Sequence, residues 1–326
     1  MRSSTEITAS FETYLRRLEY SRPPVNLYSP IEYVLSNGGK RLRPTLLAMA
    51  YNMYCDDSRV EHCFAAAAGI EIFHNFTLLH DDLMDKASVR RGKPTVHCKW
   101  NANTAILSGD EMLVLAYRQL AETAGDRLQE VMSIANETFT GIMEGQQYDM
   151  DFEARTDVTE REYIEMIRLK TSVLLGAAVR IGAVLGGANR SDAAFLYSFG
   201  EKLGLAFQLQ DDLLDVYGDP AVFGKKIGGD ILCNKKTYMY INAYRLADPN
   251  QKRELDRWAQ YDGSEPERKI AAVTAIYNSV GVRKLATDLI ADYFNQAVAM
   301  LDKVSLPDSR KQELKAYAAG LLNREN

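Results

Sequence analysis

Aspartates with the spacing of metal ligands occur twice in the chain. The segments NFTLLHDDLMD (75–85) and AFQLQDDLLD (206–215) each end in three aspartates. On a helix, residues four apart lie one turn above each other, so the outer two carboxylates of each segment share a face. Carboxylates this close raise one another's pKa unless a cation intervenes, and oxygen-only clusters select hard cations such as Mg²⁺. The predicted metal-binding residues are Asp81, Asp82, Asp85, Asp211, Asp212 and Asp215.

One such cluster is weak evidence, because an exposed acidic helix end is common. Two copies that each close an apolar helix, with Asp81 and Asp211 separated by 130 positions, are much harder to explain as solvated ends. The pair predicts two helices that face each other across a shared cavity, with metal held between them.

Basic residues follow both acidic clusters and also precede the first one. They lie in NGGKRLRP (37–44), SVRRGKP (88–94) and FGKKIGGDILCNKKT (223–237). Each segment alone has the commoner interpretation of a solvated charge run. Together they indicate a phosphate ligand, because arginine forks and lysine charges around Mg²⁺ hold phosphate groups. By formal charge, about three Mg²⁺ with several Lys and Arg balance the aspartates and two diphosphates.

The segments between these motifs have helical periodicity. Apolar residues recur at intervals of three and four over 44–54, 63–84, 102–120, 128–148 and 160–185. Strict alternation and two-residue Asn-Gly or Asp-Gly turns are hard to find, which argues against strands. The sequence therefore predicts an all-α fold.

A single domain over residues 1–326 is the predicted organisation, with residues 1–30 as a peripheral N-terminal helical segment. No linker rich in Gly, Ser or Pro divides the chain. The segment TSVLLGAAVRIGAVLGG (171–187) is apolar almost all round, so we expect it in the middle of a large helical bundle.

Composition excludes several other classes of protein. A net charge of −5 argues against nucleic-acid binding, which needs a basic face. No stretch approaches about 20 apolar residues and the start lacks a secretory core, so no membrane segment is expected. The four cysteines are scattered, which indicates neither a zinc site nor a disulfide framework and favours a cytoplasmic location.

A family resemblance joins these motifs. The segments GGKRLRP, HNFTLLHDDLMD, RRGKPTVH, LSGD, LKTS and FQLQDDLLDVYGDP, followed by GKKIGGD, resemble the trans-isoprenyl diphosphate synthases of the polyprenyl synthetase family. The match runs from about Ile31 to the C-terminus. It implies an isoprenoid synthase fold and a homodimer. It also implies Mg²⁺-dependent, head-to-tail condensation of isopentenyl diphosphate with a C5, C10 or C15 allylic diphosphate, which releases diphosphate.

The resemblance also implies roles for individual residues. Asp81, Asp85 and Asp211 bind Mg²⁺ directly, and the other aspartates, together with Asp230, act through water or their neighbours. The allylic diphosphate is held by Arg90, Lys170, Lys225 and Lys235. Isopentenyl diphosphate is held by Lys40, Arg43, His74 and Arg91, and Gly39 allows its close approach. Lys170, Thr171 and Gln208 form the catalytic set beside the reacting carbons.

This catalytic set suits an allylic carbocation, which needs dipoles rather than nucleophiles around it. The Thr171 hydroxyl, the Gln208 amide and the Lys170 carbonyl provide such dipoles. No general base is evident, so we expect the released diphosphate to take the final proton. The lysine-rich segment 218–236 is the predicted lid that excludes water.

Product length is predicted from the helix before the first aspartates. Phe76 precedes Asp81 by five residues, or about 7.5 Å along a helix, where a ring would limit elongation. Phe73 and Thr77 share this region, and the pattern is typical of short-chain synthases. The alternative is that both phenylalanines are ordinary core. The expected product is C15 or C20, and Thr77 favours C20.

Three other functions fit parts of this sequence. A class I terpene cyclase also ionises diphosphates, but it needs no second diphosphate pocket at GGKRLRP. A longer-chain polyprenyl diphosphate synthase and a catalytically silent partner subunit are the others, and a silent subunit should have lost aspartates. We interpret Asp149 and Asp151, in GQQYDMDFE, as a solvated helix end.

Overall fold

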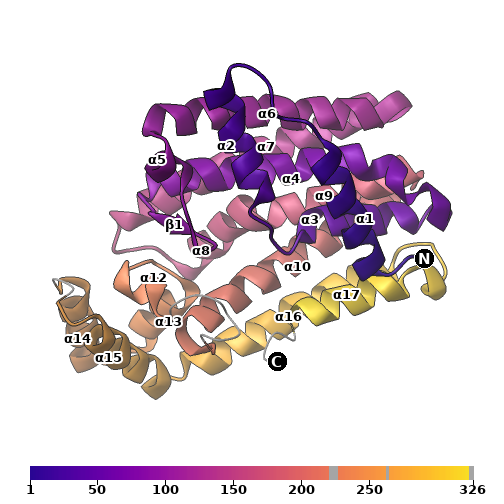
Figure 1. The fold of residues 1–326 in the computed structure, drawn as a ribbon. Helices are drawn as coiled ribbons and strands as arrows, with labels where there is room; N and C mark the ends of the chain where they lie inside the picture. The colour runs from indigo at the N-terminus through magenta and orange to yellow at the C-terminus, as the bar shows by residue number, and fades with distance from the viewer. Residues whose placement is uncertain (220–226, 262–263, 323–326) are drawn as a thin grey trace. The chain divides into compact units, whose positions relative to one another are not determined.

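The computed structural model describes residues 1–219, 227–261 and 264–322. Helices dominate the described residues (Figure 1), and the strands among them are β1 (Val89–Arg90) and β2 (Lys93–Pro94), which pair antiparallel. The predicted all-α fold is confirmed. The hairpin escaped prediction because Arg-Gly, rather than Asn-Gly, forms its two-residue turn.

The chain divides into two compact units, which are described separately. The first unit comprises Met1–Asn136, Ala177–Tyr197 and Val304–Leu314, and the second comprises Glu137–Gly176, Ser198–Lys303 and Lys315–Asn326. The single domain stays a prediction. Four elements contribute residues to both units, namely α7 (Leu128–Glu153), α9 (Val173–Gly186), α10 (Arg190–Tyr217) and α17 (Gln312–Leu322).

The first unit contains the helices of the N-terminal part of the chain. These are α1 (Ser4–Arg17), α2 (Val25–Ser36), α3 (Leu42–Asn52), α4 (Phe64–Met84), α5 (Val96–Lys99) and α6 (Ala102–Ala124), with short 3₁₀ turns at Asp57–Cys63, Gly125–Arg127 and Asp308–Arg310. The most extensive packing in this unit is between α4 and α6. It depends on Gly69, where a Cβ atom would lie 2.8 Å from the Ala116 carbonyl oxygen.

The N-terminal helix α1 is fixed at its start and along its length. The Ser3 side chain caps the helix, and the Glu6 carboxylate accepts the Ser3 backbone N–H in return, which satisfies donors that a helix end leaves unpaired. Ile7 and Phe11 are fully buried, and the Phe11 ring meets Phe64 edge-on at 5.7 Å. Residues 1–17 thus contribute to the core of the first unit.

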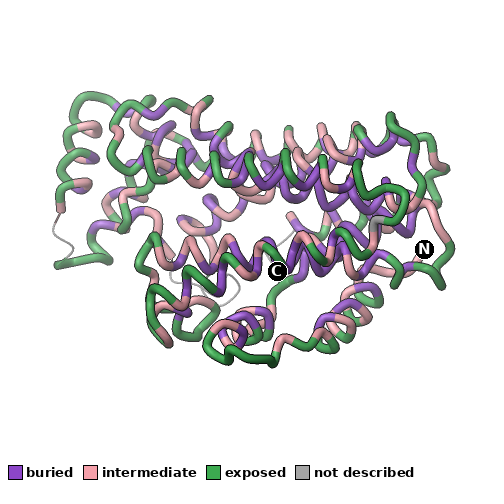
Figure 2. The backbone as a smooth tube through the Cα atoms, turned by 90° about the horizontal axis from the view of Figure 1, so that it is seen from above, coloured by how far each residue is buried: buried purple, intermediate pink, exposed green. Residues whose placement is uncertain are grey.

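The second unit has a core of its own. Its elements include α8 (Glu160–Ile167), a π-helical turn (Arg168–Ser172), α12 (Gly229–Leu232), α13 (Tyr238–Leu246), α14 (Pro249–Ala259), α15 (Pro266–Ser279) and α16 (Val282–Asp302). Leu205, Leu209, Met239 and Leu255 are among its most buried residues. Figure 2 shows buried and exposed positions alternating along the helices, as expected of helices that bury one face.

The segment predicted as one helix over 160–185 is interrupted. Residues 168–172 form a π-helical turn between α8 and α9. The apolar part is buried as expected, with Leu175, Val179 and Ile181 almost inaccessible. By length and composition Glu160–Gly186 could cross a membrane, contrary to the expectation from sequence, and 67% of its most apolar window is buried inside the protein. A core helix has the same composition.

Candidate active site

The first aspartate cluster lies at the C-terminal end of α4. Asp81 is half-buried and Asp85 is exposed, while Asp82 is only 5% exposed. The difference follows from helix geometry, because Asp81 and Asp85 share one face and Asp82 is rotated by about 100° from Asp81. The outer two carboxylates are accessible to a ligand, and the middle one belongs to the core side of α4.

Arg90, in β1, holds the buried carboxylate of Asp82. Its Nε lies 2.8 and 2.9 Å from the two Asp82 oxygens, and its Nη2 lies 3.6 Å from Asp81 Oδ2. Burial raises the pKa of Asp82, and the guanidinium of Arg90 opposes that rise. Asp82 therefore orients Arg90 beside Asp81, rather than presenting its own oxygens on the open face.

The hairpin turn brings Arg91 to the glycine-rich loop before α3. Arg91 and Gly92 both have positive φ, 52° and 74°, as a two-residue turn of type I′ requires. The Arg91 Nη1 donates to the Gly38 carbonyl. A Cβ atom on Gly39 would lie 2.9 Å from the Arg91 guanidinium, and the φ of Gly39 is +137°, so a side chain here would strain the backbone and displace Arg91.

His74, one helical turn before Leu78 on α4, belongs to the same group of cations. Burial lowers the pKa of His74 well below its usual range, and Arg43, Arg91 and Arg90 lower it further. The imidazole is neutral near pH 7 and can offer one N–H donor. Lys40 is exposed and Arg43 is half-buried. The residues predicted for isopentenyl diphosphate thus lie near one another within the first unit.

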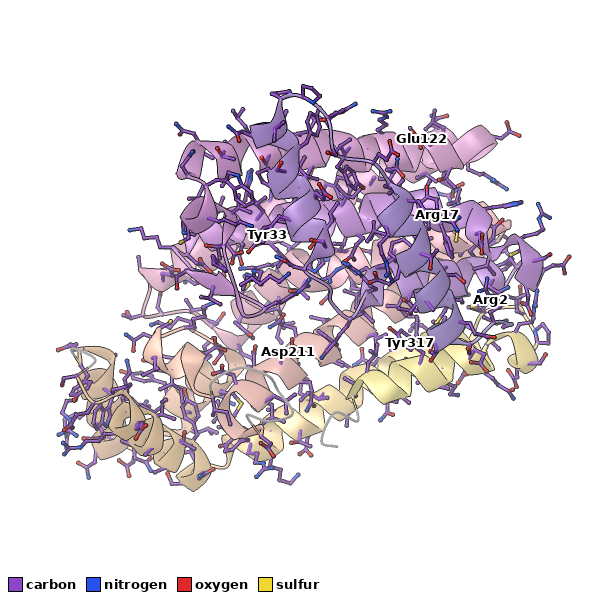
Figure 3. All side chains as sticks on the ribbon, viewed as in Figure 1. Arg2, Arg17, Tyr33, Glu122, Asp211 and Tyr317 are labelled. Carbon is purple, nitrogen blue, oxygen red and sulfur yellow. The ribbon has the colours of Figure 1, made fainter. Side chains whose placement is uncertain are left out.

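The second aspartate cluster lies on α10, in the second unit. Asp211 (labelled in Figure 3) and Asp215 are half-buried, whereas Asp212 is 4% exposed. Asp215 Oδ2 accepts the backbone N–H of Asp230 at 3.0 Å, at the start of α12. Asp230 therefore lies beside Asp215, as its implied role requires. The backbone N–H of Lys235, whose side chain is exposed, donates to the Asp230 carbonyl at 3.0 Å.

A chain of hydrogen bonds connects Asp212 to the predicted catalytic residues. The hydroxyl of Tyr163, in α8, donates to Asp212 Oδ2, and the Gln208 amide nitrogen donates to Oδ1 at 3.2 Å. The Thr171 hydroxyl donates to Gln208 Oε1 at 3.1 Å. The pKa of Asp212 is raised to about 8, by burial first and then by the charge of Asp230, while the bonds from Tyr163 and Gln208 oppose the rise.

Lys170 and Thr171 lie on the π-helical turn, a feature often found at functional sites. Two glycines let neighbouring helices contact its backbone. A Cβ atom on Gly145 of α7 would lie 2.3 Å from the Lys170 nitrogen, and one on Gly204 of α10 would lie 2.7 Å from Ser172 Cα. The turn is therefore confined on two sides within the second unit.

Two residues important for this arrangement were not predicted. Asp149 pairs with Lys170, with Nζ and Oδ2 2.5 Å apart, so its interpretation as a solvated end was wrong. No signal in the sequence pointed to this pair, because Asp149 lies on α7 and Lys170 lies on the π-helical turn. Asp151 is exposed and accepts a bond from Gln147, as expected of a solvated end. Nothing in the sequence pointed to Tyr163, whose role depends on contact with α10.

The residues predicted to limit product length form a row on α4. Phe73 is fully buried and Phe76 is 6% exposed, with their ring centroids 5.5 Å apart. Phe76 meets the His80 ring edge-on at 4.8 Å. The Thr77 hydroxyl donates to the His74 carbonyl at 2.8 Å, so this small side chain adds no bulk beside Phe76.

The aspartates fit a magnesium site completed by substrate. Among the described residues, no group of three or more His, Cys, Asp or Glu side chains is arranged to hold a metal by itself. Mg²⁺ usually takes one or two carboxylates, and substrate phosphates and water supply the rest. The accessible outer aspartates on each helix can provide these one or two carboxylates. Lys225 lies outside the described residues.

Comparison with known proteins places these features in context. The model of the polyprenyl synthetase family matches residues 24–277. A geranylgeranyl diphosphate synthase of Methanosarcina mazei is 44% identical over 223 residues, which cover 68% of each chain. A short chain isoprenyl diphosphate synthase of Methanothermobacter thermautotrophicus is 34% identical over 93% of this chain and 92% of its own.

A solved structure agrees over the full length. A crystal structure of a geranylgeranyl pyrophosphate synthase matches with a TM-score of 0.94 and 39% identity, covering 100% of both chains.

Proposed function

This chain belongs to the polyprenyl synthetase family, and from that premise we propose how its residues perform the reaction. The protein is a short-chain prenyltransferase that condenses isopentenyl diphosphate with an allylic diphosphate, head to tail. One observation supports this function most strongly. Arg90 lies beside Asp81, while Arg91 lies beside Gly39 and near His74, so neighbouring arginines serve two different diphosphate sites.

The allylic diphosphate binds at the accessible aspartates. Asp81 and Asp85 on α4 would hold Mg²⁺ directly, as would Asp211 on α10, and about three ions would balance the formal charge of the aspartates and two diphosphates. Mg²⁺ when bound supplies Lewis-acid stabilisation of the departing diphosphate. Arg90 is kept in place by Asp82 and donates its remaining N–H groups to phosphate oxygens. Lys170 exchanges the Asp149 carboxylate for the diphosphate, and Lys225 and Lys235 complete the set.

Isopentenyl diphosphate binds at the loop before α3. Lys40, Arg43 and Arg91 supply charge, neutral His74 supplies one N–H, and the missing side chain of Gly39 lets the ligand approach the backbone. These cations lie within the first unit and are distinct from Arg90, which gives the acceptor diphosphate basic residues of its own. A class I terpene cyclase has no use for such a pocket, because it binds one diphosphate.

The carbocation is stabilised by oriented dipoles from the second unit. Because the Gln208 amide nitrogen donates to Asp212, its carbonyl oxygen is directed toward Thr171. The negative ends of the Gln208 carbonyl and the Thr171 hydroxyl then face the developing positive charge. Such preorganised dipoles lower a barrier without reorganising during the reaction. The released diphosphate takes the proton lost from the acceptor.

The product is proposed to be a C20 diphosphate. The adjoining rings of Phe73 and Phe76 lie on α4, the helix that carries Asp81, and would limit the length of a chain that extends along it. Thr77 leaves more room than an aromatic side chain would, which favours C20 over C15. A longer-chain polyprenyl synthase would need a small residue at Phe76. We further propose that the protein works as a cytoplasmic homodimer.

The decisive experiment is an assay of the purified protein with radiolabelled isopentenyl diphosphate and Mg²⁺. Each of the C5, C10 and C15 allylic primers is supplied in turn, and products are dephosphorylated and separated by chromatography. We expect elongation of all three to a C20 alcohol. A cyclic hydrocarbon from the allylic substrate alone would identify a terpene cyclase, and absence of any turnover would identify a silent subunit.

A further inference from the structure

Arg41 is the one arginine of the NGGKRLRP segment to which the proposed reaction gives no role. It is 3% exposed, whereas Lys40 before it is exposed. Its φ is +46°, in the left-handed region that residues with a Cβ atom rarely adopt. A buried cation in a disfavoured backbone conformation requires strong compensating contacts.

The Arg41 guanidinium has three such contacts, each with a different helix. Nε donates to Glu12 of α1 at 2.6 Å, Nη1 donates to Glu71 of α4 at 2.7 Å, and Nη2 donates to the Leu35 carbonyl of α2 at 2.8 Å. All of these residues lie in the first unit. The planar fork of arginine can satisfy three directions at once, which the single ammonium of lysine cannot.

Glu71 connects this anchor to the acceptor pocket. Its side chain is buried, and Asn75 donates to both its backbone carbonyl and its carboxylate, at 2.8 and 3.2 Å. Asn75 follows His74 directly, so the Arg41–Glu71 pair fixes the loop relative to the helical turn that carries the imidazole. Glu71 and Arg41 both act electrostatically on Arg91. Without Arg41, the negative charge of the buried Glu71 carboxylate would be uncompensated, and it would weaken the attraction of the nearby cations for diphosphate.

We propose that Arg41 is a positioning residue for isopentenyl diphosphate. It fastens the segment Gly38–Arg43, which is the loop and the first two residues of α3, to α1, α2 and α4, so that Lys40, Arg43 and the Gly39 backbone meet the acceptor diphosphate in one geometry. This inference rests on the proposed function, and it predicts a selective effect on one substrate. The proposed site gives Arg41 no contact with the allylic diphosphate or the reacting carbons.

The test compares Arg41→Lys with the wild type and with Arg310→Lys. Arg310 is a matched control, because it also braces backbone carbonyls in the first unit, those of Met53 and Cys55, at 3.1 and 2.8 Å. We expect Arg41→Lys to raise KM for isopentenyl diphosphate about tenfold and KM for the allylic diphosphate less than about twofold. Arg310→Lys should change neither. An equal rise in both KM values for Arg41→Lys would overturn the proposal.

A double variant, Arg41→Met with Glu71→Gln, separates positioning from simple charge compensation. It removes the cation and the buried anion together, and Glu12, the other carboxylate that Arg41 holds, is partly exposed to solvent. We expect its KM for isopentenyl diphosphate to stay raised, because the loop is no longer anchored. A return to the wild-type value would reduce Arg41 to a counter-ion and contradict the proposal.

Calorimetric titration of the metal-free proteins with isopentenyl diphosphate completes the design. If the wild type binds isopentenyl diphosphate and Arg41→Lys binds it more weakly, the positioning role is supported even if turnover is absent. A wild type that turns over and an Arg41→Lys protein that binds equally well would refute the Arg41 inference while leaving the function intact.

Discussion

The Tyr163 hydroxyl donates a hydrogen bond to the buried carboxylate of Asp212, and the Gln208 amide nitrogen donates to the other oxygen of that carboxylate. These bonds decide which way the Gln208 amide points. The amide oxygen is then left to accept from Thr171. The middle aspartate of the second cluster thus orients a neighbouring dipole, as Asp82 orients Arg90 in the first.

Tyr163→Phe should lower kcat about tenfold with little change in either KM, because the Gln208 dipole loses its fixed orientation while the diphosphate contacts remain. The control is Tyr54→Phe, which removes a similar bond at 3.2 Å to Asp192, within the first unit. Both variants should lose comparable thermal stability. Steady-state kinetics with each substrate varied make the comparison, and equal kcat for the two variants would contradict the role of Tyr163.

Gly145→Ala should reduce kcat by about an order of magnitude or more, because its Cβ atom would meet the Lys170 nitrogen at 2.3 Å and displace the π-helical turn. Gly320→Ala is the matched control, since nothing lies within 4 Å of a Cβ atom there, in helix α17. That control should keep full activity and gain up to about 1 kcal/mol of stability. Kinetics and thermal unfolding test both substitutions.

His74 predicts a pH dependence of stability. Its folded-state pKa is lowered, so between about pH 6.5 and that lower value the unfolded chain binds a proton that the folded protein does not. This contribution is complete above about pH 6.5 and is lost as the pH falls, at up to about 1.4 kcal/mol per pH unit. We expect the free energy of unfolding, measured with urea, to fall less between pH 7.5 and pH 5.5 for His74→Gln than for the wild type. Identical losses would show that His74 is not held neutral.

Asp81→Ala and Asp211→Ala should each lower turnover by about two or more orders of magnitude, because an open-face carboxylate that fits Mg²⁺ is removed. Each should also require a higher Mg²⁺ concentration for half-maximal rate. Asp151→Ala is the control, since that carboxylate is exposed and accepts a bond from Gln147. Near-normal rates in either cluster variant would exclude that residue as a ligand.

Phe76→Ala should shift the product beyond C20, because the ring that limits elongation is removed. Chromatography of the dephosphorylated products gives the chain-length distribution. Phe64→Ala, at the start of the same helix, removes a ring packed against Phe11 and should leave the product unchanged. Each variant should lose about 3–5 kcal/mol of stability, as buried phenylalanines do. An unaltered distribution for Phe76→Ala would mean that Phe76 is ordinary core.

Much of the site could be predicted because its signals are local. The i, i+4 spacing of Asp81 and Asp85 follows from helix geometry alone, and the structure indeed leaves these carboxylates on the more open face of α4. The approach of isopentenyl diphosphate to the Gly39 backbone stays a prediction, and the structure places the Arg91 guanidinium beside Gly39. Helical periodicity predicted α4 over 63–84, and the helix spans Phe64–Met84.

Other features depended on contacts between distant segments. The charge of Lys170 could be read from the sequence, but its partner Asp149 could not, because a helix end near solvent has the same composition as one that pairs with a lysine. The interruption of 160–185 by a π-helical turn arises where α7 and α10 contact its backbone.

The sequence by itself determined the fold class, the family and the inventory of charged groups, because helical periodicity and motif spacing are properties of short segments. Only the tertiary structure decided the role of each charged group, since the burial and the bonding partners of a side chain depend on which helices pack together. Arg41 and Arg43 are two residues apart and chemically identical, yet Arg41 is buried as an anchor between three helices and Arg43 stays near His74.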